Sequence, residues 1–303
     1  MKITNNENLP QVVVDIMENL NYPPRGADRI GVTELIGPPL VRQLKRKHWN
    51  ELEEDASDGA WRLMGTAVHK LIEGKLPEHI TERRCEAVFD DITVAGRADV
   101  VDGNVLYDWK ITSAWHKTFA DGLPDDWVKQ MNAYAYLLGD ITSAKVVVIY
   151  RDWQKTRVKE GDDYPPRPIM AYDIPLATKD DQLKYILKRI RLHKSDPLMC
   201  TADERWATGD TWAIYKNSNK TASRVLPSEE QAKNYLAEMK KAQPKHAWRI
   251  DLRKGIDKKC ENYCPVRKFC PFKEAKKCGF CGSALDPDTN YCPKCKNYDG
   301  EVK

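Results

Sequence analysis

Apolar side chains recur every three or four residues along residues 61–76, which is the period of an α-helix. They occupy four positions in this segment: Trp61, Met64, Val68 and Leu71. A second helix is predicted upstream, capped near Thr33 and interrupted by Pro38 and Pro39, because proline does not continue a helix from within.

Apolar and polar residues alternate farther along the chain, which is the period of β-strands. Strands are predicted at residues 82–89, 92–101 and 104–111, and an Asp-Gly turn joins the last two. On the third strand Asp108 and Lys110 share a face. If the Asp-Gly pair is a two-residue turn, Asp99 on the second strand faces Leu106, and Asp108 is its diagonal neighbour at about 8 Å.

The remaining pattern mixes helices and strands. Next come a helix at 125–138, an apolar strand at 144–150, a loop with a short strand at 151–175 and an amphipathic helix at 179–194. After a shift in composition near Pro197, the pattern predicts a hairpin around 217–220, a helix from Ser228 and a strand at 247–252. These elements predict an α/β fold.

Composition narrows the class of protein. Of the 303 residues, 41% are hydrophobic and 31% are charged, the balance of a soluble globular chain. No apolar run approaches the roughly 18 residues that a membrane span needs, and the N-terminus has no secretory pattern. We therefore expect a cytoplasmic protein in which most of the nine cysteines are metal ligands rather than disulfide partners.

Charge is unevenly distributed along the chain. Residues 228–277 hold fourteen Lys and Arg against seven Asp and Glu, whereas the whole chain has a net charge of +4. A basic C-terminal third suits a polyanionic partner, although a solvated lysine-rich helix has the same composition.

Two carboxylates and an ammonium group come together in the predicted hairpin. Asp99 and Asp108, on neighbouring strands, can hold one or two Mg²⁺ or Mn²⁺ ions, which prefer oxygen ligands. Lys110 can orient a water molecule or stabilise developing negative charge. Taken alone, an exposed salt-bridged face explains the same three residues.

Two helical motifs add polar groups beside this hairpin. His69 follows Gly65 by one helical turn, and the small glycine lets another backbone or a metal ion approach closely. Gln130 and Tyr134 are also one turn apart, so they project together beside the sheet. Each pair taken alone is as easily structural.

The order of these motifs along the chain is Gly-x3-His, Gly-x2-Asp, Asp-x-Lys and Gln-x3-Tyr. This conjunction resembles the RecB-like branch of the PD-(D/E)XK nucleases, and more narrowly its phage and prophage exonuclease-like members, between Val32 and Phe272. The resemblance implies a restriction-endonuclease-like core, with a mixed central sheet flanked by helices, and metal-dependent hydrolysis of DNA.

The resemblance also implies roles for individual residues. His69, Asp99 and Asp108 would bind the catalytic Mg²⁺ or Mn²⁺, with the main-chain carbonyl group of Ile111 as a further ligand. Lys110 would activate or orient the attacking water.

Gln130 and Tyr134, by the same resemblance, would position the lysine or a DNA phosphate. Two further acids, Glu73 and Glu86, could support the metal ion, but a solvent-facing carboxylate explains each of them as well.

Four cysteines form a first candidate metal group. Cys260, Cys264 and Cys270 are spaced x3 and x5, and we expect Cys200 to be the fourth ligand. Four thiolates suit either a [4Fe-4S] cluster or Zn²⁺, and spacing alone does not separate the two. Iron-sulfur exonucleases of the RecB-like branch use Cys-x2-Cys-x5-Cys with a cysteine upstream of the His motif, so this chain departs from their pattern. We expect iron-sulfur, with Zn²⁺ as the alternative.

The last four cysteines form two Cys-x2-Cys pairs, separated by ten residues. They are Cys278, Cys281, Cys292 and Cys295. This spacing predicts a zinc ribbon in which Zn²⁺ is structural, because thiolates fill all four tetrahedral positions.

Aromatic and basic residues are mixed in the segment between Cys200 and Cys260. Lys216, Lys220 and Arg224 could neutralise DNA phosphates beside aromatic rings that stack on bases. A small core over the metal group explains the same aromatic residues.

Three regions are expected: a RecB-like nuclease core, a hairpin-helix insert with the first cysteine group, and the zinc ribbon, at residues 1–199, 200–275 and 276–303. The expected activity is that of an Mg²⁺- or Mn²⁺-dependent exonuclease acting on DNA ends or single strands, in phage recombination, replication or DNA degradation. Its partners would be DNA and phage recombination or replication proteins, in the cytoplasm of a bacterial host. One alternative is an endonuclease of the CRISPR-spacer-trimming or structure-specific type. Another is an inactive nuclease fold that binds DNA or recruits a partner.

Overall fold

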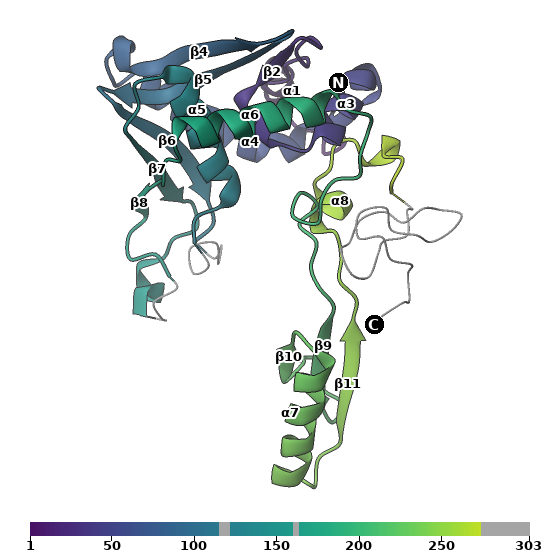
Figure 1. The fold of residues 1–303 in the computed structure, drawn as a ribbon. Coiled ribbons are helices and arrows are strands. Elements are labelled where there is room, and N and C mark those ends of the chain that lie inside the picture. The colour runs from purple at the N-terminus through teal and green to yellow at the C-terminus, as the bar shows by residue number, and fades with distance from the viewer. Residues whose placement is uncertain (115–121, 160–163, 274–303) are drawn as a thin grey trace. The chain divides into compact units, whose positions relative to one another are not determined.

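A computed structural model describes residues 1–114, 122–159 and 164–273 (Figure 1). The chain divides into two units, Met1–Leu198 and Met199–Lys303. The predicted zinc ribbon lies outside the described residues.

A six-stranded mixed sheet forms the centre of the first unit (Figure 1). Its order is β2-β5-β6-β7-β8, with β4 also paired to β5. β6 and β7 are parallel, whereas β5 and β6, like β7 and β8, are antiparallel. The strands are β2 (Arg29–Gly31), β4 (Thr81–Phe89), β5 (Ile92–Asp102), β6 (Val105–Thr112), β7 (Ser143–Tyr150) and β8 (Ile169–Asp173).

Five α-helices of the first unit flank or back this sheet. α5 packs against β4 to β7, and α6 packs against α5, α2 and α3, whereas α4 contacts β4 and β6. The predicted mixed sheet flanked by helices is therefore confirmed. The helices are α2 (Val32–Ile36), α3 (Pro39–Lys47), α4 (Ala60–Glu73), α5 (Asp125–Leu138) and α6 (Lys179–Lys194).

The core lies between the sheet and α5. Alternate residues of β7 are buried, as the period of a strand requires, and Val146 and Val148 are fully inaccessible to solvent. Leu106 of β6 and Met131 of α5 belong to the same buried cluster. Burial of each such side chain stabilises the fold by about 1.5–3 kcal/mol, which fixes the strands that carry the polar residues.

The start of α2 differs from the predicted cap at Thr33. The cap is Gly31, two residues earlier, so the helix begins at Val32, and the Glu34 carboxylate accepts the N–H of Gly31 at 2.8 Å. This bond satisfies the N–H of the N-cap residue, as the glutamate of a capping box does. The prolines separate α2 from α3 as predicted, and Pro39 is the first residue of α3, where a missing N–H costs nothing.

The turn between β5 and β6 lies one residue later than predicted. Asp102 pairs with Val105, so the two-residue loop is Gly103-Asn104 rather than the Asp-Gly pair. Gly103 has φ +57, and glycine in the first position of a two-residue loop is typical of a type II′ turn. Consequently Val101, not Asp99, lies opposite Leu106.

A small N-terminal layer completes the first unit. β1 (Lys2–Thr4) and β3 (Glu53–Asp55) pair in parallel, and α1 (Gln11–Asn19) packs beside them. The described 3-10 helices of the first unit are Trp49–Glu51, Ala56–Gly59, Glu78–Ile80 and Lys155–Lys159, and one in the second unit is Arg267–Phe269.

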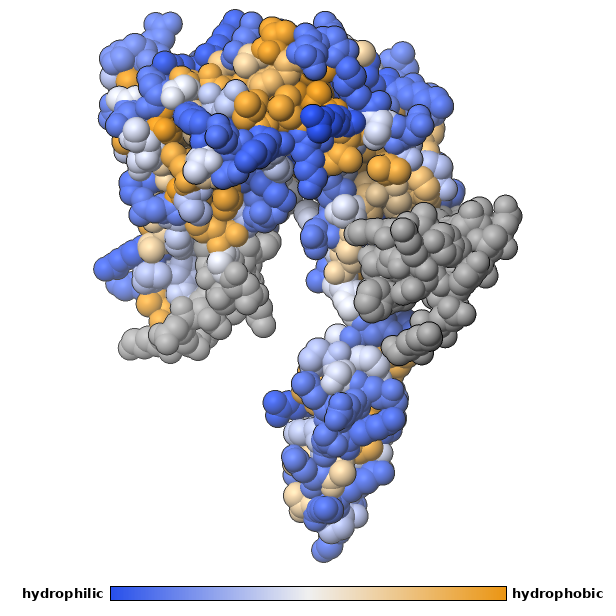
Figure 2. Space-filling model, viewed as in Figure 1, coloured by the Kyte–Doolittle hydropathy of each residue, from blue (hydrophilic) through white to orange (hydrophobic). Residues whose placement is uncertain are grey.

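The second unit contains a three-stranded antiparallel sheet backed by one long helix. The sheet order is β10-β9-β11, and α7 contacts all three strands. Ser228 caps α7 by accepting the N–H of Gln231 at 3.2 Å, so the hairpin, helix and strand predicted here are all present. Its described surface in Figure 2 is mostly hydrophilic. The elements are β9 (Thr211–Lys216), β10 (Arg224–Leu226), α7 (Glu229–Ala242), β11 (Trp248–Arg253) and α8 (Lys258–Asn262).

In the part of the chain that the structure describes, no helix combines the length and the hydrophobicity needed to cross a membrane.

Candidate active site

Helix α4 turns polar side chains toward β3 and β5. Arg62 forms an ion pair with Glu54 at 2.8 Å, and His69 is half-buried against β5. By contrast, Trp61 and Leu71 of the apolar stripe are 58% and 60% exposed. An amphipathic helix usually buries its apolar stripe, so polar contacts fix the orientation of this helix.

Asp99 occupies the point where β5 and β6 separate. The pairing of the two strands ends at Val100 and Tyr107. One Asp99 oxygen accepts the N–H of Trp109 at 2.9 Å, and the other lies 3.3 Å from Nδ1 of His69. The carboxylate therefore takes the place of a strand bond and also contacts α4.

The alternation of β5 is interrupted beside Asp99. A Cβ at Gly96 would meet the Tyr134 ring at 2.5 Å, so Gly96 faces α5. Asp108 also faces α5, where Gln130 donates to it. If the β5–β6 register is extended by one residue, Asp108 lies opposite Asp99, which is three residues from Gly96. A regular strand sends such residues to opposite faces, so β5 changes face between Gly96 and Val100.

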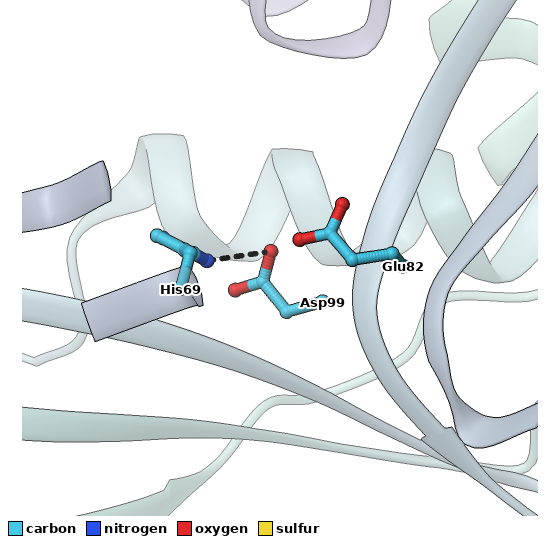
Figure 3. A group of neighbouring side chains, drawn as sticks. All are labelled: His69, Glu82 and Asp99. Carbon is cyan, nitrogen blue, oxygen red and sulfur yellow. Dashed lines mark ion pairs between the residues drawn. The ribbon is translucent and has the colours of Figure 1, made fainter. Parts of the chain in front are cut away.

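Glu82 joins His69 and Asp99, and the sequence interpretation missed it. One ligand atom of each residue lies within 4.8 Å of the others (Figure 3). Glu82 stands at the start of β4 with φ +52, between residues that pair with Ala98 and Val100 of β5. The antiparallel pairing of β4 with β5 sets Glu82 beside Asp99, and a prediction of that pairing could have identified Glu82.

Asp108, Lys110 and Gln130 form a closed triangle on the α5 face of the sheet. The Lys110 ammonium lies 2.8 Å from Asp108 Oδ2 and donates to Gln130 Oε1 at 2.9 Å. The Gln130 amide in turn donates to Asp108 Oδ1 at 3.3 Å. Because an amide has one donor side and one acceptor side, these contacts fix the orientation of the Gln130 amide and the direction of the Lys110 side chain.

Tyr134 takes a different direction from Gln130. Its hydroxyl donates to the main-chain oxygen of Arg97 at 3.1 Å, and its ring covers Gly96. Burial raises its pKa well above the ordinary value. Tyr134 thus holds the backbone of β5 and has no bond to Lys110 among the described contacts. Ile111 is half-buried in β6, opposite Ile149 of β7.

The two further acids considered from the sequence lie outside this group. Glu73 pairs with Lys70 at 2.6 Å on α4, and Glu86 pairs with Arg29. The Glu86 carboxylate is exposed to solvent, and that of Glu73 is partly exposed.

The electrostatics of the site favour a bound cation. Burial raises the pKa of Asp108, with Lys110 opposing the shift and Asp99 adding to it. Burial likewise raises the pKa of Glu82, and the bond to Asp99 raises the pKa of His69. A divalent ion would stabilise the ionised carboxylates, and three carboxylates with one imidazole are a donor set that suits Mg²⁺ or Mn²⁺.

The first cysteine group gathers within the second unit. Burial raises the pKa of Cys200 to about 12, and the nearby thiols of Cys260, Cys264 and Cys270 raise it further. No three of these four described thiols have sulfur atoms all within 4.8 Å of one another.

A buried arginine links the two segments that carry these cysteines. Arg205 donates to the main-chain oxygen of Cys200 and forms a 3.0 Å ion pair with Asp257. The ring of Trp206 packs against that of Tyr263, with centroids 5.5 Å apart. The second group, Cys278, Cys281, Cys292 and Cys295, lies outside the described residues.

The three basic residues predicted to bind DNA differ in their contacts. Lys216 donates to Gln243 at 2.8 Å, and the Arg224 guanidinium lies 5.1 Å from the centre of the Tyr235 ring. Lys220 is exposed between β9 and β10.

Comparison with known proteins identifies one family. The model described as the PD-(D/E)XK nuclease superfamily matches residues 38–271. A comparison with curated proteins gives no significant match.

Two solved structures are among the similar ones. The crystal structure of SSO0001 is 16% identical, with a TM-score of 0.42, over 61% of this chain and 86% of that one. A phage-related exonuclease from Haemophilus somnus 129PT is 15% identical, with a TM-score of 0.33, over 59% of this chain and 95% of that one. TM-scores this low do not establish a shared fold, so neither match bears on function.

Proposed function

The chain belongs to the PD-(D/E)XK nuclease superfamily, and on that premise we propose that it is a metal-dependent deoxyribonuclease that degrades DNA from an end. The superfamily implies a nucleic acid substrate and divalent metal ions. The exonuclease activity, the preference for DNA ends or single strands and the role in phage recombination, replication or DNA degradation are inferred from the resemblance of the motifs.

One observation carries the proposal. Ligand atoms of His69, Glu82 and Asp99 lie within 4.8 Å of one another, in the same unit as the triangle of Asp108, Lys110 and Gln130. An exposed salt-bridged face would leave its carboxylates in water, whereas the side chain of Asp108 is only 6% exposed. Lys110 pairs with Asp108, and a divalent ion would offset the remaining repulsion among the neighbouring acids.

The proposed metal ligands come from three elements. His69 of α4, Glu82 of β4 and Asp99 of β5 would hold the ion, with Asp108 of β6 beside them. The ion, when bound, polarises a phosphodiester oxygen and lowers the pKa of water. We also keep the Ile111 carbonyl group as a proposed further ligand.

The residues of the triangle would act on the substrate directly or through one another. Lys110 would orient the attacking water and stabilise the charge that develops on the phosphate oxygens. Gln130 would hold the lysine in place, and Tyr134 would do so indirectly, by fixing β5.

The test is degradation of end-labelled linear DNA with Mg²⁺ or Mn²⁺. Wild-type protein is expected to degrade the DNA, and Asp108→Ala is expected to lose at least about a thousandfold in rate, because its loss removes a buried acid of the site. Glu86→Gln is a matched control, since Glu86 is an exposed acid on β4. Equal degradation by wild type and Asp108→Ala would reject the proposal.

Two further measurements separate the alternatives. An endonuclease of the spacer-trimming or structure-specific type would cut closed circular DNA, which an exonuclease leaves intact. A protein that only binds DNA or recruits a partner would bind labelled DNA and release no product with either metal ion.

We further propose that Cys200, Cys260, Cys264 and Cys270 hold a [4Fe-4S] cluster, and that Cys278, Cys281, Cys292 and Cys295 hold Zn²⁺. Four thiolates suit either a [4Fe-4S] cluster or Zn²⁺, and the preference for iron-sulfur at the first group rests on the resemblance to the iron-sulfur exonucleases of the RecB-like branch.

A further inference from the structure

An arginine stacks on an exposed tryptophan near the proposed metal ligands. Trp61 is 58% exposed at the start of α4, and the guanidinium carbon of Arg151 lies 3.8 Å from the centre of its ring. An arginine in this position covers one face of the indole and holds it still. The exposed fraction leaves much of the ring open to a ligand.

The pair lies on a direct path to the site. Trp61 precedes His69 by eight residues on the same helix, which corresponds to about 12 Å along the axis. Gly65 lies midway, and a Cβ at this position would meet no atom within 4 Å. The surface between the tryptophan and the histidine is therefore open enough for a substrate backbone to approach.

Arg151 is fixed beside the strand that carries Lys110. It directly follows β7, and its N–H donates to the Thr112 oxygen at the end of β6 at 3.0 Å. Its side chain is exposed, so the edge of the guanidinium remains available to an anion. The aromatic ring and the cation thus lie near the C-terminal end of β6, the strand that carries Asp108 and Lys110.

We propose that Trp61 and Arg151 form a platform on which an unpaired base stacks, so that a single DNA strand passes over Gly65 to the acids beside His69. This inference rests on the proposed nuclease function and specifies its substrate. Every base has a π face, so the platform is tolerant of sequence. Bases inside a duplex stack on one another, so the platform takes a single strand or a frayed end.

The distance fixes the number of nucleotides involved. At about 3.4 Å per stacked nucleotide, a distance of about 12 Å corresponds to about three or four nucleotides between the stacked base and the cut phosphate. Arg151 would neutralise a phosphate next to the stacked base, which offsets the repulsion between DNA and the carboxylates of the site.

The experiment measures binding of a labelled, unstructured single strand by fluorescence anisotropy. The full chain carries Asp108→Ala, so that cleavage does not disturb the measurement. In this background Trp61→Ala is expected to raise Kd about 5- to 100-fold, the range for loss of one base-aromatic stack. Trp61→Phe should restore most of the affinity, because it restores a ring.

Two controls separate stacking from a general loss of fold. Leu63→Ala removes a partly exposed apolar side chain from the same helical turn, so it should leave Kd unchanged. On a strand with abasic sites opposite the platform, Trp61→Ala should have no effect, because no base remains to stack.

The outcomes also distinguish this inference from the proposed function. Suppose that wild-type protein cuts DNA but Trp61→Ala, in the Asp108→Ala background, binds the single strand as tightly as Asp108→Ala alone. The proposed platform is then wrong, and the proposed nuclease activity is unaffected. An equal loss on the abasic strand also overturns the platform. If wild-type protein cuts no DNA but Trp61→Ala weakens binding to intact strands alone, the platform stands and the nuclease falls.

Discussion

Gln130 is the residue that connects the two charged groups of β6. It accepts from Lys110 at 2.9 Å and donates to Asp108 at 3.3 Å, so it holds both in one arrangement. Without it, the lysine keeps its attraction to the carboxylate but loses a fixed direction. Its contribution is therefore to the positioning of Lys110 rather than to charge.

Replacement of this amide tests its positioning role. Gln130→Leu is expected to lower kcat for DNA hydrolysis about 10- to 100-fold with a smaller change in KM, as loss of a residue that orients a reacting group does. The control is Lys129→Gln: Lys129 is half-buried, pairs with Asp125 and should not be needed for the wild-type kcat. An unchanged kcat in Gln130→Leu would show that the lysine does not need this support.

His193 gives the first unit a dependence on pH that is independent of the active site. Its Nε2 donates to the main-chain oxygen of Leu35 at 3.1 Å, and Nδ1 has no hydrogen-bond partner among the described residues. Burial lowers its pKa to about 4, with a contribution from nearby Arg189 and Arg42. The folded protein therefore keeps this imidazole neutral.

Acidification should destabilise the fold through this histidine. Between pH 6.5 and pH 4 the unfolded chain binds a proton that the folded chain excludes, so stability falls as the pH falls. We expect a loss of about 2 kcal/mol from this group between pH 7 and pH 5, measured by urea unfolding. His193→Gln should show a correspondingly smaller pH dependence, and an equal one would contradict the buried neutral state.

The sequence could predict some residues of the candidate site and not others. Asp108 and Lys110 share a strand face by alternation alone, and Gln130 lies one helical turn from Tyr134. Glu82 could not be identified in this way, because its place depends on how β4 pairs with β5. Local periodicity says which residues share a face, whereas strand pairing says which faces meet.

At the scale of elements, close packing of α5 on β5 contrasts with open space along α4. A Cβ at Gly96 would lie 2.5 Å from the Tyr134 ring and 2.9 Å from Val32. A Cβ at Gly65 would meet nothing. The two glycines therefore serve different purposes, one in packing and the other in leaving the helix surface open.

Alanine at each glycine should change stability in opposite directions. Gly96→Ala is expected to destabilise the first unit by about 1–3 kcal/mol through overpacking. Gly65→Ala is expected to stabilise α4 by about 0.5–1 kcal/mol, because alanine is the better helix former. Urea unfolding measures both, and a neutral Gly96→Ala would contradict the close contact with Tyr134.

The elements themselves were largely predictable, and their orientation was not. The helices at 125–138 and 179–194 have the bounds that periodicity predicts. The apolar stripe of α4 did not indicate that the polar side of this helix, which carries Arg62 and His69, faces inward. The turn after β5 was misplaced by one residue, because Gly103 suits either the second position of one turn type or the first position of another.

At the scale of the whole molecule, each candidate metal group belongs to a single unit. The acids and His69 lie within Met1–Leu198, and the four cysteines of the first group lie within Met199–Lys303. Spacing in the sequence proposes the four-cysteine group, and both that group and the choice between iron and zinc stay predictions.

The iron-sulfur proposal predicts a coloured protein. Anaerobically purified wild type should absorb near 400 nm and contain about four iron atoms per chain, with about one zinc in the ribbon. Cys264→Ser should lose the absorbance, whereas Cys85→Ala, which replaces a buried thiol of the first unit, should keep it. A colourless wild type with about two zinc ions would favour zinc at both cysteine groups.

The most direct test of the account is calorimetric titration of Mn²⁺ into the full chain in the absence of DNA. The account predicts that Asp99→Asn binds Mn²⁺ at least about tenfold more weakly than wild type, because Asp99 contacts both His69 and the β6 backbone at the proposed ion site. Glu86→Gln, which changes an exposed acid on β4, should bind like wild type. Equal Mn²⁺ affinity in wild type and Asp99→Asn would contradict the claim that the acids beside His69 hold the metal ion.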